Sequence, residues 1–154
     1  MNENNKMIAN ALSLRTPQRK SLDLLEQIVQ KIDLKPDADL KEALAAIHEI
    51  APKIEDFERK FPSVCFALAT GVGKTRLMGA FIAYLHLEKG IKNFFVLAPN
   101  LTIYNKLIAD FTPNTPKYVF PGIQEFAMNR PQVITGETYS QVGDFFGIPR
   151  TVIF

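Results

Sequence analysis

The stretch VCFALATGVGKT, residues 64–75, decides the predicted fold of this 154-residue chain. Residues 64–69 form a short continuous apolar run, which is typical of a strand buried on both faces of a parallel sheet. A glycine-containing turn follows, and then a helix is predicted from about Lys74 to Lys89, with Gly90 as its C-terminal stop. A buried strand, a glycine turn and a helix in this order make the setting in which a loop can hold phosphate groups.

The turn itself has the residue types that phosphate binding needs. Gly71 and Gly73 allow backbone conformations that a side chain would forbid, and they allow close approach to a ligand. The N–H groups of such a turn point inward toward an anion, and the start of the helix adds a partial positive charge. The backbone of the turn is therefore predicted to bind the phosphates of a nucleotide through Thr70, Gly71, Val72 and Gly73.

Two side chains at the start of the predicted helix extend this site. Lys74 would supply a full positive charge for the β- and γ-phosphates. The hydroxyl of Thr75 would ligate a magnesium ion. The sequence thus predicts a site for ATP and Mg²⁺.

The rest of the chain after residue 63 alternates between strands and helices. Further buried strands are predicted at residues 94–98, 117–120 and 132–135, and another begins at residue 151. A helix from about residue 100 to Asp110 or Phe111 separates the first two of these strands. This order predicts an α/β fold, with a parallel sheet and flanking helices.

The first part of the chain is predicted to be helical. Residues 1–13 are expected to be a loose end or one short turn, and residues 14–62 a helical segment. In that segment Thr16 and Pro17 are typical of a helix start, and a second helical region spans residues 37–61. The second region is either a spacer that packs on the core or a docking surface for a partner. Residues 63–154 form the predicted nucleotide-binding lobe.

Composition and cysteine content indicate an ordinary globular domain. Apolar residues make up 47% and charged residues 22%, and the net charge of +2 is too small to indicate nucleic-acid binding by itself. The single cysteine, Cys65, excludes an intrachain disulfide, and its place in an apolar run predicts a buried thiol. Neither a membrane-spanning stretch nor a signal-peptide pattern is present, so we expect a cytoplasmic protein.

The loop resembles motif I of superfamily-two helicases, written A-T-G-x-G-K-T, which residues 69–75 carry intact. The strict pattern G-x-x-x-x-G-K-[ST] is not met, because its first glycine would fall on Leu68. This departure disfavours small P-loop kinases and GTPases. The resemblance implies a P-loop NTPase lobe with a RecA-like parallel sheet.

Two other stretches resemble elements of the same motors. Leu14-Arg15-x-x-Gln18 is similar to the L-R-x-x-Q element, whose glutamine hydrogen-bonds adenine, although the proline stands one place later here, at Pro17. The resemblance implies nucleotide contacts for Gln18, and Arg15 either stacks on the base or supports the fold.

Residues 96–101 are similar to helicase motif Ia, which contacts the backbone of a bound DNA strand. The resemblance implies DNA contacts for Pro99, Asn100 and Leu101. The alternative is a strand-to-helix connection in which Asn100 only caps the helix. The stretch Thr135–Thr138 is a poor match to a later motif and is better interpreted as a turn.

Over residues 14–154 the chain resembles the restriction subunit of type III restriction enzymes most. That resemblance implies an ATP-dependent helicase or translocase with an endonuclease, which works on DNA beside a methyltransferase subunit. Alternatives are another superfamily-two motor, such as a DNA repair helicase, or a non-catalytic interaction module. Such motors need an Asp-Glu pair after a buried strand, and no Asp-Glu dipeptide occurs in this sequence. We therefore expect a fragment of a longer motor that binds nucleotide without hydrolysing it.

Overall fold

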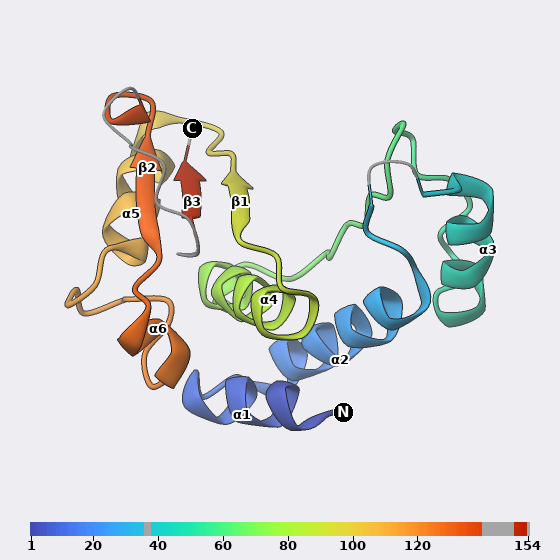
Figure 1. Cartoon of the computed structure of the whole chain (residues 1–154), viewed down its shortest axis with the longest axis horizontal. Coiled ribbons are helices and arrows are strands. Elements are labelled where there is room, and N and C mark those ends of the chain that lie inside the picture. The colour runs from blue at the N-terminus through green and yellow to red at the C-terminus, as the bar shows by residue number, and fades with distance from the viewer. Residues whose placement is uncertain (36–37, 140–149, 154) are drawn as a thin grey trace.

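The computed structural model describes residues 1–35, 38–139 and 150–153. Within these residues the helices and strands, in chain order, are α1 (Glu3–Ala11), α2 (Thr16–Lys31), α3 (Leu40–Ile50), α4 (Lys74–Lys89), β1 (Asn93–Val96), α5 (Leu101–Phe111), α6 (Gln124–Met128), β2 (Gln132–Thr135) and β3 (Arg150–Ile153). Helices α1, α2 and α4 lie together, the strands with α5 lie to one side of them, and α3 stands at the opposite side (Figure 1). None of the described helices is long and apolar enough to cross a membrane.

Helix α4 is central to the packing. It contacts both α1 and α2, and it buries apolar residues on several sides, among them Leu77, Ile82 and Tyr84. A Cβ on Gly79 would lie 2.7 Å from the carbonyl oxygen of Val119, so the chain before α6 lies directly on the helix. The predicted span of this helix is confirmed, and Gly90 ends it in the left-handed conformation with φ of 66°.

The expectation of a loose N-terminus is wrong, because residues 3–11 form helix α1. Asn2 caps it by accepting a hydrogen bond from the N–H of Asn5 at 2.8 Å. Ile8 and Ala9 are fully buried. The apolar period is hard to see in the sequence because the buried face also includes the polar Asn5.

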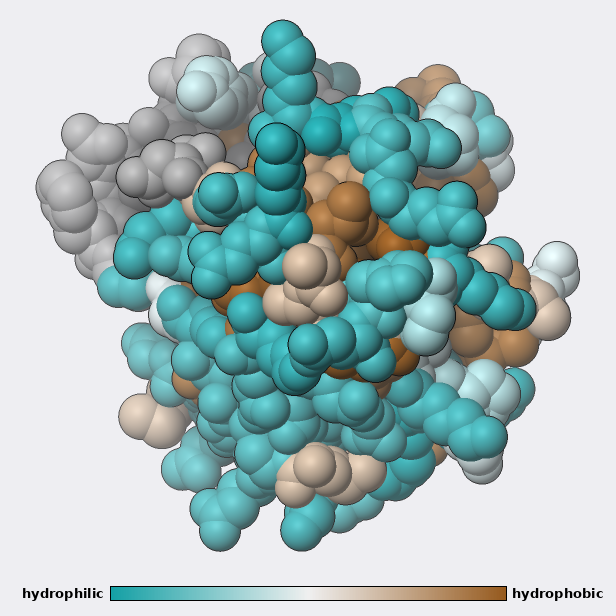
Figure 2. Space-filling model, turned by 90° about the vertical axis from the view of Figure 1, so that its right-hand side faces the viewer, coloured by the Kyte–Doolittle hydropathy of each residue, from teal (hydrophilic) through white to brown (hydrophobic). Residues whose placement is uncertain are grey.

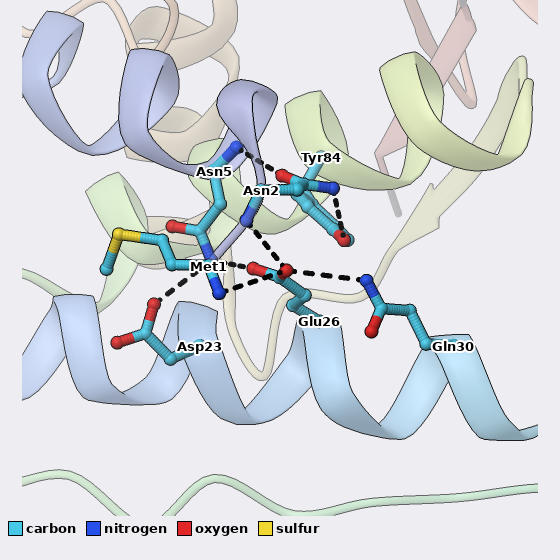
Figure 3. A network of polar contacts seen from close by, with 7 residues as sticks. All are labelled: Met1, Asn2, Asn5, Asp23, Glu26, Gln30 and Tyr84. Atoms are coloured by element: carbon cyan, nitrogen blue, oxygen red, sulfur yellow. Dashed lines mark hydrogen bonds and ion pairs between the residues drawn. The ribbon is translucent and has the colours of Figure 1, made fainter.

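A polar network joins α1 to α2 and α4 (Figure 3). Its centre is Glu26 on α2, which is only 4% exposed. The carboxylate accepts hydrogen bonds from the N–H of Asn2 at 2.8 Å and from the side-chain amide of Asn5. Asn2 Nδ2 donates in turn to the hydroxyl of Tyr84 on α4 at 3.2 Å. Because a buried carboxylate is stable only when it is hydrogen-bonded, this network fixes how the three helices meet.

Tyr84 is affected by the same surroundings. Its burial, together with the negative charges of Glu26 and Glu88, raises the pKa of the phenol to about 12. Both causes disfavour the phenolate, so the neutral phenol is retained well into the alkaline range.

The second helical region is shorter than predicted. Only Leu40–Ile50 is helical, and residues 51–61 run in turns and bends. Pro52 interrupts the helix, and Glu58 has a positive φ of 52°, which a helix cannot include. Phe57 is buried, but Phe61 is exposed. The face that carries α3 is mostly hydrophilic with a few apolar side chains between the polar ones (Figure 2).

The described strands form a parallel sheet in the order β1-β3-β2. Thr151 of β3 pairs with Phe94 of β1 on one side and with Val133 of β2 on the other. The predicted strand at residues 132–135 is confirmed with the same bounds, and β1 and β3 lie within one residue of their predicted starts.

Two predicted strands are wrong. Residues 117–120 form a bend in which the N–H of Val119 donates to the carbonyl of Asp110 at 2.9 Å, so the segment is tied to α5 rather than to the sheet. Its side chains still enter the core, where Phe120 contacts the rings of Phe111 and Phe126. The apolar pattern indicated burial correctly, but burial does not require strand pairing.

The second wrong strand is the segment before the glycine turn, residues 64–69. In the described structure these residues form neither a strand nor a helix. Alternate residues face inward, and Phe66 packs edge-on against Phe81 of α4 with ring centroids 4.8 Å apart. Cys65 faces outward and is exposed, so the prediction of a buried thiol is also wrong.

Candidate phosphate-binding site

The glycine turn has the backbone geometry that the sequence predicts. Gly71 and Gly73 both have positive φ, 80° and 90°, where residues with a side chain are strained. Gly73 is the N-cap of α4. A Cβ on Gly71 would have no heavy atom within 4 Å, so the space above the turn is open.

The turn and the first turn of α4 offer backbone donors to that open space. The first helical hydrogen bond runs from the N–H of Leu77 to the carbonyl of Gly73 at 3.1 Å. None of the amide groups from Gly71 to Arg76 donates to another residue in the described part of the chain. Unpaired N–H groups at a helix N-terminus favour an anion, because the helix dipole adds positive charge there.

The predicted side-chain ligands stand at the same place. Lys74 is the first residue of α4 and is exposed, while Thr75 follows it and is half-buried. Thr70 is exposed and Val72 is half-buried within the turn. The donors, the ammonium group and the hydroxyl fit a phosphate chain with its metal ion, and these residues are the ones that could hold Mg·ATP.

Gln18 lies directly against this turn, although it precedes Gly73 by 55 residues. Its side chain is 2% exposed, and its Nε2 donates to the carbonyl of Gly73 at 2.9 Å. Its Oε1 accepts from the backbone N–H of Arg15 at 2.8 Å. Each end of the amide therefore has one protein partner, and each retains one further hydrogen-bonding position. The adenine contact stays a prediction, and what the structure adds is a bond from Gln18 to the turn.

Arg15 and Thr16 differ from the expected helix start. Arg15 is the N-cap of α2, Thr16 is already helical, and Pro17 follows it in the first turn. The helix start predicted from Thr16 and Pro17 is thus confirmed, but the cap is Arg15 and Thr16 is the first helical residue. Arg15 is exposed beside Gln18, and its nucleotide contact stays a prediction.

The segment that resembles motif Ia connects β1 to α5. Pro99, Asn100 and Leu101 are all exposed. Asn100 Oδ1 accepts from the N–H of Ile103 at 3.0 Å, so the predicted capping role is confirmed. The DNA contact of these residues stays a prediction. In the later stretch, the N–H of Thr138 donates to the carbonyl of Thr135 at 3.1 Å, which confirms the predicted turn.

One contact of the site was missed in the sequence. Lys106 on α5 reaches the Thr75 hydroxyl, with 3.4 Å between Nζ and Oγ1, and also lies 3.5 Å from Asp110 Oδ2. The sequence places Lys106 among ordinary helix-surface residues. The sequence did contain one indication that Lys106 is held in place. Lys106 and Asp110 are four residues apart, which puts both side chains on one face of the helix.

A family model supports the interpretation of these residues. The model described as type III restriction enzyme, res subunit matches residues 12–143, which include Gln18, the glycine turn and residues 99–101. No curated protein and no solved structure matches the chain. At the level of the family, the match implies a helicase-like P-loop domain that uses ATP and a metal ion and interacts with DNA. The chain belongs to the type III restriction enzyme res subunit family.

Proposed function

We propose that this chain is the ATP-binding front part of a DNA helicase or translocase in a type III restriction-modification system. The observation that carries the proposal is the open turn at residues 70–73, which combines two glycines of positive φ with unpaired amide groups at the start of α4. We also propose that strands β1, β2 and β3 are part of a RecA-like sheet. A DNA repair helicase would have a similar site, and the family match favours the restriction subunit.

The division of roles follows from the charges and donors of the site. The amide groups from Gly71 to Arg76 bind phosphate oxygens, and Lys74 places its ammonium group at the β- and γ-phosphates. Thr75 ligates the magnesium ion, which neutralises phosphate charge when it is bound. Gln18 fixes the turn through the Gly73 carbonyl and uses its remaining donor and acceptor for adenine.

Nucleotide binding without turnover is the second part of the proposal. Hydrolysis requires a group that orients the attacking water, which in this family of motors is the glutamate of an Asp-Glu pair. The sequence has no Asp-Glu dipeptide. Phosphate release by the purified chain should therefore stay at the level of a Lys74→Ala control.

DNA binding and partner binding are proposed for the motor as a whole. Residues 99–101 are exposed at the start of α5, where a helix N-terminus can receive a DNA phosphate. A methyltransferase subunit is the proposed protein partner.

A competition experiment tests the nucleotide proposal. The chain is equilibrated with a fluorescent ATP analogue and magnesium, and ATP, GTP and inorganic phosphate are added as competitors. We expect ATP to displace the analogue at the lowest concentration, because it offers both the triphosphate and adenine. Equal displacement by inorganic phosphate and ATP would show that the site binds anions without recognising the nucleotide. Absence of saturable analogue binding would contradict the proposal.

A further inference from the structure

We propose that Lys106 is a tethered cation that holds the Thr75 hydroxyl when no metal ion is bound, and that a divalent metal must displace it. This inference rests on the proposed function, since it concerns the metal position of the same nucleotide site. Lys106 lies on α5 and is not part of the glycine turn.

The contact joins two helices that are distant in sequence. Lys106 Nζ lies 3.4 Å from Oγ1 of Thr75, which is 31 residues earlier in the chain. An ammonium group can only donate, so the hydroxyl oxygen accepts. The oxygen that would ligate magnesium is therefore already in contact with a positive charge.

Asp110 holds the ammonium in this position. Its Oδ2 lies 3.5 Å from Lys106 Nζ, and the residue is only 5% exposed. Its backbone is fixed as well, because its carbonyl accepts the N–H of Val119 at 2.9 Å. A carboxylate this deeply buried needs a charged or hydrogen-bonding partner, and Lys106 provides one.

Lys106 itself is free enough to move. Its side chain is 49% exposed, and a lysine has a flexible four-carbon stem. The 3.4 Å contact with Thr75 is a long hydrogen bond from a half-exposed ammonium group, so the ammonium can leave Thr75 while it keeps its ion pair with Asp110. The arrangement thus combines a fixed anchor, Asp110, with a movable arm.

A metal ion and the ammonium group cannot share the Thr75 oxygen. A divalent ion at that oxygen would lie within a few ångström of a like charge, and the repulsion between them is strong outside bulk water. The metal therefore has to displace Lys106 from Thr75. Removing the lysine charge removes this competition, so metal should then bind to the nucleotide complex at lower concentration.

The test is a magnesium titration of the chain saturated with a fluorescent ATP analogue. The variant Lys106→Met keeps the length of the side chain and removes its charge. The matched control is Lys41→Met, because Lys41 is exposed on α3, far from the site, and the charge change is the same (Figure 1). Circular dichroism and thermal unfolding check that the variants are folded.

We expect the magnesium concentration at the midpoint to be about three- to tenfold lower in Lys106→Met than in the wild type, the range for one partly screened charge. Lys41→Met should have the wild-type midpoint. In a Thr75→Val background, which lacks the hydroxyl, Lys106→Met should cause no further shift.

Three results would overturn the inference while wild-type binding remains. These are an unchanged midpoint in Lys106→Met, a higher midpoint, or an equal shift in Lys41→Met. Absence of saturable analogue binding by the folded wild type is a different result, since it would overturn the proposed function and this inference together.

Discussion

The glycine turn at residues 70–73 and the apolar segment at residues 64–69 are consecutive in the chain, but they are held in different ways. The turn is bonded to Gln18 from α2 and continues directly into α4. The segment forms no strand in the described structure, although alternate side chains are half-buried against the core. The difference shows that a turn can be fixed by its glycines and one long-range hydrogen bond, whereas a strand needs a neighbour.

The helices behind the turn account for its support. Helix α2 carries both Gln18 at its start and Glu26 near its middle, and α4 begins at the turn itself. Changes in this helical part should therefore affect stability more than changes on the outer side of the segment.

The largest expected effect is that of Glu26→Ala. The change leaves the N–H of Asn2 without its acceptor and leaves the side-chain amide of Asn5 with Asp23 alone, and we expect a loss of about 2–3 kcal/mol in the free energy of unfolding. Urea denaturation measures it. The control is Glu49→Ala, which removes an exposed ion pair with Lys31 and should cost less than about 0.5 kcal/mol. Equal losses in the two variants would show that the network does not stabilise the helices.

A smaller effect is expected for Gln18→Ala. It removes the bonds to Gly73 and Arg15, and we expect a loss of about 1–2 kcal/mol together with weaker nucleotide binding. The matched control is Gln27→Ala, an exposed glutamine on the same helix. Urea denaturation and nucleotide titration are the measurements. If both variants bind nucleotide like the wild type, the bond from Gln18 to the turn has no part in binding.

A third effect appears only at alkaline pH. The pKa of Tyr84 is raised from 10.0 to about 12, so the folded state binds this proton more tightly than the unfolded state. The stability from Tyr84 is complete below pH 10 and should be lost as pH rises from 10 to 12. Thermal unfolding in this window should show a steeper decline for the wild type than for Tyr84→Phe. Parallel declines would contradict the raised pKa.

The smallest effect is expected in the segment before the turn. Cys65 is exposed, so Cys65→Ser should change the free energy of unfolding by less than about 0.5 kcal/mol. A thiol reagent should also modify Cys65 in the native protein as fast as in a short peptide. Modification of Cys65 only after the protein unfolds would show that the segment is buried, as its apolar pattern predicts.

Local sequence patterns predicted the elements that depend on local physics. Helix α4 lies between Gly73 and Gly90 as expected, and Asn100 caps α5, because glycine conformation and capping involve neighbouring residues. Helix α1 was missed because its buried Asn5 is stabilised by Glu26, whose position in space the sequence does not reveal.

Strand pairing and the contact that Lys106 makes in the site both depend on residues that are distant in the sequence. Residues 117–120 are apolar enough for a strand, but a bond from Val119 to Asp110 ties them to α5. The phosphate turn could be predicted from its own residues, whereas the contact of Lys106 with Thr75 could not, since it depends on the position of α5 relative to the start of α4.

In the proposed function, the turn at residues 70–73 and Lys74 bind the phosphates of ATP. Isothermal titration calorimetry with ATP and magnesium, on the wild type and Lys74→Ala, tests it most directly. Lys74 is exposed, so the variant should fold like the wild type. We expect saturable binding by the wild type and binding at least about tenfold weaker in Lys74→Ala, because the variant loses a charge-assisted contact. Equal binding by both proteins, or no binding by the folded wild type, would contradict it.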